Sequence, residues 1–240
     1  MACKKTVLSK ELKAIIFDLD DTLYDCFDQL VKPARRFALH QMIDAGLDVP
    51  FDCLLKKRNK YSKDYKEERI YRELVKSFNL QNKKLEKAIV NAGYLSFYNY
   101  FRIKNPKIKL FPDAKNILSR LKKKYKLFLL TLGIKKTQEK KIHSLGIKDN
   151  FDRIYFKSVY HGADKKTVMK KILKDHNLKP NQVMMIGDRR DSDISSANSL
   201  GIYSALRNHG EYNHLKPKNK LEEADFEFKR LSQLKIIFDI

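Results

Sequence analysis

The chain has 240 residues, of which 42% are hydrophobic, enough to bury the core of one large domain or of a domain carrying a smaller insert. No apolar run approaches the roughly 20 residues that cross a bilayer, and the lysine-rich start lacks the apolar stretch of a secretory signal. We therefore expect a cytoplasmic protein with no membrane partner. Three cysteines without a CxxC pair argue against a disulfide framework and a thiolate metal site.

The charge is strongly positive, with 51 Lys and Arg against 29 Asp and Glu and a net charge of +22. Such a field attracts anionic substrates and can hold nucleic acid non-specifically. The lysines are nevertheless spread over the whole chain, without an arginine-rich tail or a nucleic-acid-binding motif. We favour a compositional bias over a dedicated nucleic-acid function. We assign no role to the six histidines, although His209 and His214 share one polar segment.

The first predicted element is a buried strand over residues 14–17, an apolar run followed by Asp18, Asp20 and Asp21. Burying acids at a strand end is unfavourable unless a cation neutralises them or they take part in chemistry. Asp18 and Asp20 are two residues apart, so both can face one cavity, where one could attack a substrate while the other moves a proton. The alternative is a solvated turn, because Asp is an ordinary turn residue.

Residues 24–110 have few strand-like runs and carry apolar residues at helical spacing, such as Ile70, Leu74 and Phe78. This pattern predicts several helices. We expect the aromatic residues over 94–101 to pack between these helices rather than to stack on nucleic-acid bases.

From residue 111 the pattern changes to alternating helices and strands, which predicts an α/β fold, a doubly wound parallel sheet with helices on both faces. In chain order we expect a helix capped by Asp113 and ending near 124, a strand over 126–131, a helix over 137–145, a strand over 151–156, a helix over 164–176, a strand over 182–187, a helix over 192–200, a strand over 202–206, and an edge strand over 225–228 before a last helix.

Ligands of doubly wound sheets bind at the carboxyl edge of the strands, so the residues that follow each strand are candidate site residues. Helix-face periodicity favours Lys165 over Lys166 as the lysine of this set. Besides Asp18 and Asp20, the residues expected at this edge are Thr131, Leu132 and Gly133 after the second strand, Lys165 or Lys166 at a helix start, and Asp188, Asp191 and Asp193 after the strand over 182–187.

This ordered set resembles the haloacid dehalogenase (HAD) superfamily over residues 14–206, and each piece follows the expected strand or begins the expected helix. The matching pieces are Asp18-Leu19-Asp20-Asp21-Thr22-Leu23, then Thr131, then Lys165 or Lys166, and finally Gly187-Asp188-Arg189-Arg190-Asp191-Ser192-Asp193.

The resemblance implies that Asp18 is the nucleophile and Asp20 the general acid/base. It also implies that Thr131 and Lys165 bind the phosphate. We expect the backbone amides of Leu132 and Gly133 to donate to the phosphoryl oxygens as well. Leu132 departs from the family pattern, because many relatives carry a polar residue such as asparagine there.

The metal implied by the resemblance is Mg²⁺, bound by Asp18, Asp188 and the backbone carbonyl of Asp20. Asp193 is expected to hold a metal-bound water.

The resemblance further implies a Rossmann-like core over 1–23 and 111–240 with a helical cap over 24–110. The expected function is magnesium-dependent hydrolysis of a small phosphomonoester, such as a sugar phosphate or nucleotide, through an aspartyl-phosphate. Three alternatives stay open: a phosphomutase, a dehalogenase of the same superfamily, and a basic nucleic-acid-binding protein on this fold. Asp20 argues against the dehalogenase, which needs only the first aspartate.

Overall fold

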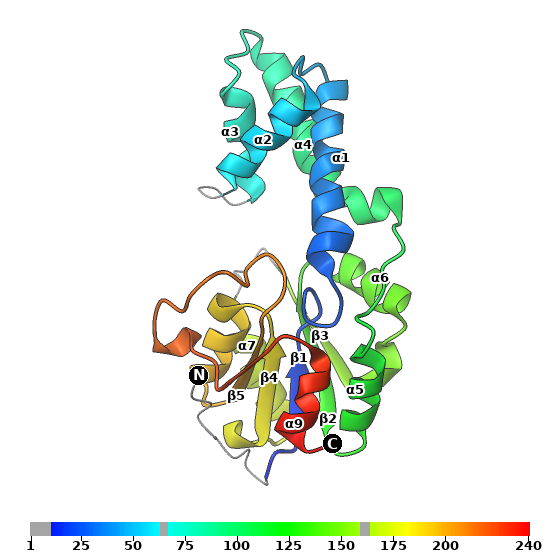
Figure 1. The fold of residues 1–240 in the computed structure, drawn as a ribbon, viewed down its shortest axis with the longest axis vertical. Coiled ribbons are helices and arrows are strands. Elements are labelled where there is room, and N and C mark those ends of the chain that lie inside the picture. The colour runs from blue at the N-terminus through cyan, green and yellow to red at the C-terminus, as the bar shows by residue number, and fades with distance from the viewer. Residues whose placement is uncertain (1–10, 63–66, 159–163) are drawn as a thin grey trace. The chain divides into compact units, whose positions relative to one another are not determined.

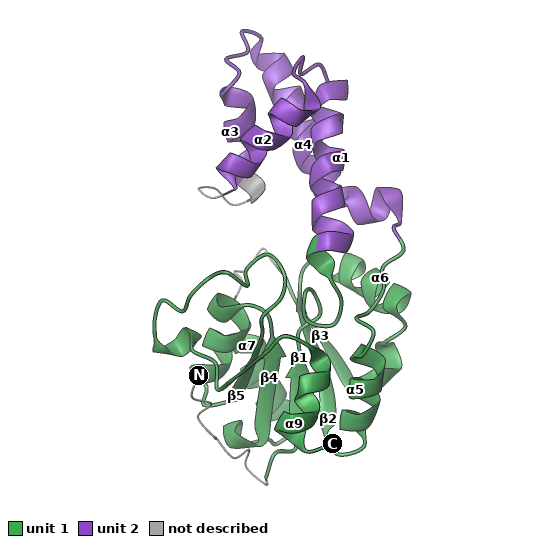
Figure 2. Ribbon diagram, viewed as in Figure 1, with its two compact units in different colours: residues 1–27, 107–240 green, residues 28–106 purple. Residues whose placement is uncertain are grey.

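The structure is a computed structural model that describes residues 11–62, 67–158 and 164–240 (Figure 1). The chain forms two compact units (Figure 2). Residues 1–27 and 107–240 make up one, called here the core unit, and residues 28–106 make up the other, called the helical unit. The boundaries expected from the sequence, at 23/24 and 110/111, lie close to these divisions.

The core unit contains a parallel sheet, whose order over the described residues is β3-β2-β1-β4-β5-β6. The predicted doubly wound sheet is confirmed, and the strand expected at an edge, β6, lies there. The strands are β1 (Ala14–Phe17), β2 (Lys126–Leu132), β3 (Arg153–Lys157), β4 (Val183–Gly187), β5 (Tyr203–Arg207) and β6 (Phe226–Phe228).

Helices cover both faces of this sheet (Figure 1). Met169 and Ile172 of α7 pack with Ala197 of α8 against buried side chains of β1, β2 and β4. The right-handed connections of parallel strands place α5 and α6 on the other face. The helices are α5 (Ala114–Lys122), α6 (Lys135–Leu145), α7 (Lys166–Asp175), α8 (Ser195–Asn198) and α9 (Leu234–Phe238).

Two local predictions in the core unit differ in part from the structure. The helix expected over 192–200 contains only the short α8, because Arg190–Ile194 form a π-helical turn in which the carbonyl of Arg189 accepts from the amides of both Asp193 and Ile194. Asp113 is the N-cap residue of α5, as expected, but its side chain makes no capping hydrogen bond, because its Oδ2 accepts from the Ser232 amide at 2.7 Å.

The helical unit consists of α1 (Lys32–Asp44), α2 (Phe51–Tyr61), α3 (Glu67–Lys76) and α4 (Lys83–Lys104), as far as the described residues show. Its buried core includes Leu39 and Met42 of α1 with Leu74 of α3. Phe97 packs against this core as expected. Tyr94 and Tyr98 are 36% and 38% exposed and lie outside the buried core, although the Tyr98 ring packs against Phe97 with centroids 5.1 Å apart.

The two chain segments that join the units pair with each other inside the core unit. Tyr24 forms an antiparallel bridge with Leu110, and the Phe111 amide donates to the Leu23 carbonyl at 3.1 Å.

In the part of the chain that the structure describes, no helix has both the length and the apolar content needed to cross a bilayer.

Candidate active site

In the register of the sheet, β1 and β4 end within one residue of each other at one edge. Phe17, the last residue of β1, pairs with Leu129 of β2 and with Ile186 of β4. Asp18 is therefore level with Gly187, the last residue of β4, and Asp188 follows directly, whereas β2 continues beyond this level to Leu132. Residues far apart in the sequence meet here because β1 lies between β2 and β4.

Three buried acids lie together at this edge. One carboxylate oxygen from each of Asp18, Asp188 and Asp193 lies within 4.8 Å of the other two. Gly187 makes room for this group, since a Cβ added to it would lie 2.3 Å from Cγ of Asp193. The Arg189 amide donates to Oδ2 of Asp193 at 3.1 Å and fixes the direction of that side chain.

Burial is unfavourable for these carboxylates in their charged form. Burial, together with the charges of Asp193 and Asp20, raises the pKa of Asp18 to about 7 even though Lys165 opposes the shift. Burial and the charges of Asp18 and Asp193 raise the pKa of Asp188 well above its usual value. A group of oxygen ligands that is short of positive charge is suited to a hard divalent cation.

Lys165 lies against this acidic group. Its buried ammonium group contacts Oδ1 of Asp18 and donates to Oδ1 of Asp193 at 2.7 Å. It precedes the first turn of α7, where the Met169 amide donates to its carbonyl. Of the two lysines weighed from the sequence, the structure brings Lys165 to the acids.

The carboxylate of Asp20 lies apart from the three-acid group and is held by other donors. The ammonium of Lys141 donates to its two oxygens at 2.9 and 3.0 Å, and the Tyr24 hydroxyl donates to Oδ1 at 2.5 Å. Gln138 Nε2 donates to Oδ2 at 3.0 Å. Burial alone would raise the pKa of Asp20, but Lys141 and these hydrogen bonds outweigh it, so the pKa is lowered.

Thr131 is buried, and its hydroxyl oxygen accepts from Nε2 of Gln138 at 2.6 Å. Gln138 also donates to the Leu132 carbonyl at 2.9 Å. The expectation that the Gly133 amide faces a phosphate is wrong, because this amide donates to the Lys157 carbonyl at 2.9 Å as β2 ends beside β3.

Sequence reasoning missed Gln138, Lys141 and Tyr24. The two helical residues are three apart and so share one face of α6, and Tyr24 is four residues beyond Asp20. That spacing was visible in the sequence. Without the fold, however, nothing distinguished Lys141 from the many other lysines of this chain.

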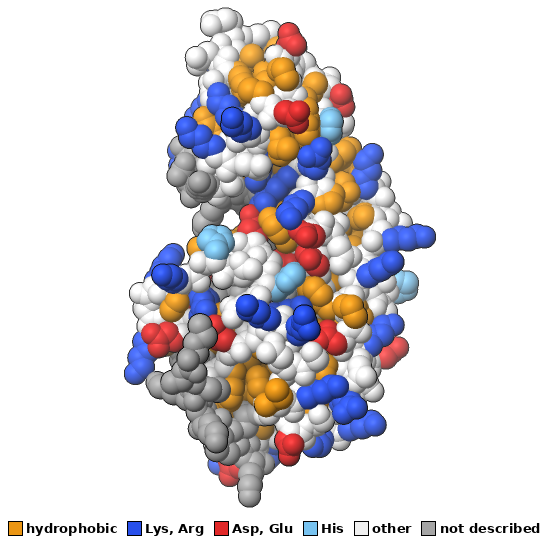
Figure 3. Space-filling view, in the orientation of Figure 1, with side chains coloured by type: hydrophobic (Ala, Val, Ile, Leu, Met, Phe, Trp, Pro, Cys, Tyr) orange, Lys and Arg blue, Asp and Glu red, His pale blue; other side chains and the backbone are white. Residues whose placement is uncertain are grey.

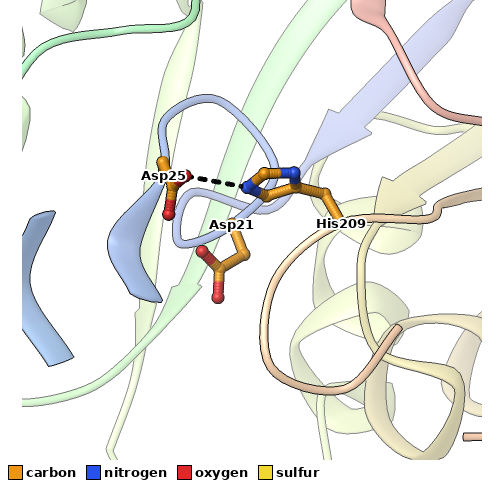
Figure 4. Close-up of side chains that lie close together, drawn as sticks. All are labelled: Asp21, Asp25 and His209. Atoms are coloured by element: carbon orange, nitrogen blue, oxygen red, sulfur yellow. Dashed lines mark ion pairs between the residues drawn. The ribbon is translucent and has the colours of Figure 1, made fainter. Parts of the chain in front are cut away.

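A second group lies beside the site and involves His209, to which we assigned no role from the sequence. His209 Nε2 forms an ion pair with Oδ2 of Asp25 at 3.2 Å, and Asp21 lies close to both (Figure 4). Asp21 has a φ of 57°, its Oδ1 accepts from the Phe27 amide, and burial raises its pKa to about 6. The group ties the turn after β1 to the loop after β5.

Arg207, the last residue of β5, contacts the same turn after β1 through its side chain. Its buried guanidinium donates to the Thr22 carbonyl and lies 3.6 Å from the centroid of the Phe111 ring. Burial lowers the pKa of Arg207 to about 10.

Comparison with known proteins agrees with this geometry. A family model described as haloacid dehalogenase-like hydrolase matches residues 12–201. Glyceraldehyde 3-phosphate phosphatase of Pyrococcus furiosus is 33% identical over 94% of this chain and 92% of its own length. The protein of the same name from Methanocaldococcus jannaschii is 31% identical over 93% and 95%.

The solved structures show the same fold. The HAD hydrolase YfnB of Bacillus subtilis, described as bound to magnesium, matches 96% of this chain and 100% of that one, with a TM-score of 0.66 and 17% identity. The chain therefore belongs to the haloacid dehalogenase-like hydrolase family, and it is a phosphoric monoester hydrolase of that superfamily.

Proposed function

We propose that this phosphatase is magnesium-dependent and hydrolyses a small phosphomonoester through an aspartyl-phosphate on Asp18. The observation that carries the proposal is the buried group of Asp18, Asp188 and Asp193, with the ammonium of Lys165 against it. A carboxylate can attack a phosphate dianion only where nearby positive charge neutralises both, and this group is arranged to hold such charge.

The ligands that we propose for Mg²⁺ are Asp18, Asp188 and the backbone carbonyl of Asp20, with Asp193 acting through a bound water. All of these ligands are oxygen atoms, which Mg²⁺ prefers. The raised pKa values of Asp18 and Asp188 indicate that the site holds too little positive charge for its carboxylates, and a bound cation would supply it. When bound, Mg²⁺ would supply the charge that lets a phosphate dianion approach a carboxylate.

The chemistry would have two steps. Lys165, the Thr131 hydroxyl and the Leu132 amide would bind the phosphoryl oxygens. Asp20 is a carboxylate in this structure, because its pKa is lowered, so it would first take up a proton as the substrate binds. Asp18 would then attack phosphorus, the bond from phosphorus to the ester oxygen would break, and Asp20 would give that proton to the ester oxygen. In the second step Asp20 would take a proton from a water that attacks the aspartyl-phosphate, which frees phosphate and restores Asp18.

The proposed substrate is a small sugar phosphate, and glyceraldehyde 3-phosphate is the first to test because the relatives described above are named for it. We propose that the helical unit acts as the cap that contacts the leaving group, and that the enzyme works in the cytoplasm. A nucleic-acid role is less favoured, because Lys and Arg side chains are scattered over the face in Figure 3 instead of forming one patch.

The test is phosphate release from a panel of phosphomonoesters, including glyceraldehyde 3-phosphate and nucleotides, with and without Mg²⁺. Asp18→Asn should abolish release, whereas the matched variant Asp191→Asn should keep it, because Asp191 is exposed and pairs with Arg189. Full activity of the purified Asp18→Asn protein would contradict the proposed nucleophile. Halide release from a haloacid would indicate a dehalogenase, and isomerisation without phosphate release a phosphomutase.

A further inference from the structure

The partners that hold the carboxylate of Asp20 in one orientation all belong to the core unit, as far as the described residues show. Lys141 lies almost equally far from both carboxylate oxygens, at 2.9 and 3.0 Å. Tyr24 donates to one oxygen and Gln138 to the other. Rotation of the Asp20 carboxylate would break several of these contacts at once, so its direction is fixed before any substrate binds.

The donors that hold Asp20 are themselves well packed. The side chain of Tyr24 is fully buried, and the Lys141 side chain is 11% exposed. Gln138 and Lys141 lie three residues apart on α6, so one helix face supplies two of the three donors. A rigid support of this kind is what fixes a reacting group within a fraction of an ångström.

We propose that Lys141 is a positioning residue for phosphoester hydrolysis, one that aims Asp20 at the leaving-group oxygen. This inference rests on the proposed function, in which Asp20 is the general acid/base. Lys141 would act through Asp20 and would not touch the phosphate, which is assigned to Thr131 and Lys165.

The same helix face also connects the acid/base to the phosphate site. Nε2 of Gln138 donates to Thr131 at 2.6 Å and to Asp20 at 3.0 Å. The position of Asp20 relative to a phosphate bound at Thr131 is therefore set by α6. A purely structural ion pair would not need this second connection.

The expected consequence is a loss in turnover with little change in substrate binding. A displacement of about 1 Å in a reacting group can cost on the order of 100-fold in rate. We expect Lys141→Met to lower kcat by about 10- to 100-fold and to change KM by less than about threefold. The loss should be larger for alkyl phosphates than for p-nitrophenyl phosphate, since an activated leaving group needs less help from a proton.

The test is a double-mutant cycle between Lys141 and Asp20 in the full-length protein with Mg²⁺. Lys141→Met is measured in the wild-type background and in the Asp20→Asn background, with p-nitrophenyl phosphate so that residual rates remain measurable. Lys141→Arg should restore part of the lost kcat, since it returns a cation. Lys136→Met removes an exposed lysine of the same helix and should leave the rates unchanged.

If Lys141 acts through Asp20, Lys141→Met has almost no effect once Asp20 is Asn. An equal loss of rate in both backgrounds, or equal losses for alkyl and aryl esters, would overturn the inference and leave the proposed function intact. If the Asp20→Asn variant hydrolyses phosphate esters at the wild-type rate, Asp20 is not the general acid/base. In that case the proposed mechanism and this inference are both wrong. Should Lys141→Met fail to fold, Lys141→Gln, which keeps a donor, replaces it in the same cycle.

Discussion

Replacing Asp188 by asparagine should make the protein more stable when no divalent cation is bound. The oxygens of Asp188, Asp18 and Asp193 lie within 4.8 Å of one another. Because the pKa values of Asp18 and Asp188 are raised, both carry full charges only at a pH above these values, where two charges at that separation repel by roughly 3.5 kcal/mol at an effective dielectric constant of about 20. Asparagine keeps the shape and removes the charge, so we expect a gain of about 2–3 kcal/mol, or roughly 4–12 °C in Tm.

The gain should depend on pH in a defined direction. The pKa of Asp188 is raised above its usual 3.8, so between these two values the folded protein binds more protons than the unfolded chain. The stability of the wild-type protein therefore falls as the pH rises through that window, and the Asp188→Asn variant lacks this component. The difference between the two proteins should accordingly grow as the pH is raised.

The assay is thermal and urea unfolding of both proteins in a chelator and again with added Mg²⁺. Wild-type protein should gain stability from the cation by mass action, while Asp188→Asn should lose most of that gain. Asp191→Asn controls for the loss of a carboxylate elsewhere in the same segment. The reasoning is refuted if Asp188→Asn is less stable than wild type in the chelator, or if it keeps the full cation-dependent gain.

Three further predictions follow from single contacts. Gly187→Ala places a Cβ 2.3 Å from Cγ of Asp193, so it should lower the unfolding free energy by about 2–3 kcal/mol and weaken the stabilisation by Mg²⁺. Thermal melting with and without the ion measures both effects, and an undiminished Mg²⁺ effect would contradict the prediction. Arg207→Met removes the donor to the Thr22 carbonyl and should lower the unfolding free energy by about 2–3 kcal/mol in urea titrations, whereas a loss within error would show that the contact is dispensable. Burial, with Lys126 and Arg153 nearby, lowers the pKa of His176 below its usual 6.5. The wild-type protein should therefore lose stability as the pH falls below that value, and His176→Gln should lose less. Equal slopes of unfolding free energy against pH for the two proteins would exclude this.

The sheet and the strand ends could be predicted because each buried parallel strand is a short apolar run, and such runs end at the edge where Asp18 and Asp188 lie. The connection rules for parallel sheets restrict the order of the strands but do not select one. That β1 and β4 are neighbours, which brings Asp18 to Asp188, was expected only through the family resemblance.

The partners of Asp20 could not be predicted in this way. Lys141 reaches it from a helix 121 residues along the chain, and its direction depends on how α6 packs on the sheet. The Gly133 amide was misjudged because β2 continues through Leu132, so that this amide still pairs with β3. The π-helical turn at Arg190–Ile194 was missed because its sequence fits an ordinary helix start.

The antiparallel bridge between Tyr24 and Leu110 has a consequence for how this architecture can change over evolution. The segments that leave and re-enter the core unit are hydrogen-bonded to each other, so the two ends of the insertion are held together by the core unit itself. An insertion at such a junction adds little strain to the host, since loop closure depends only weakly on the length inserted. A catalytic edge built in this way can keep its chemistry while the inserted module is lengthened, shortened or exchanged.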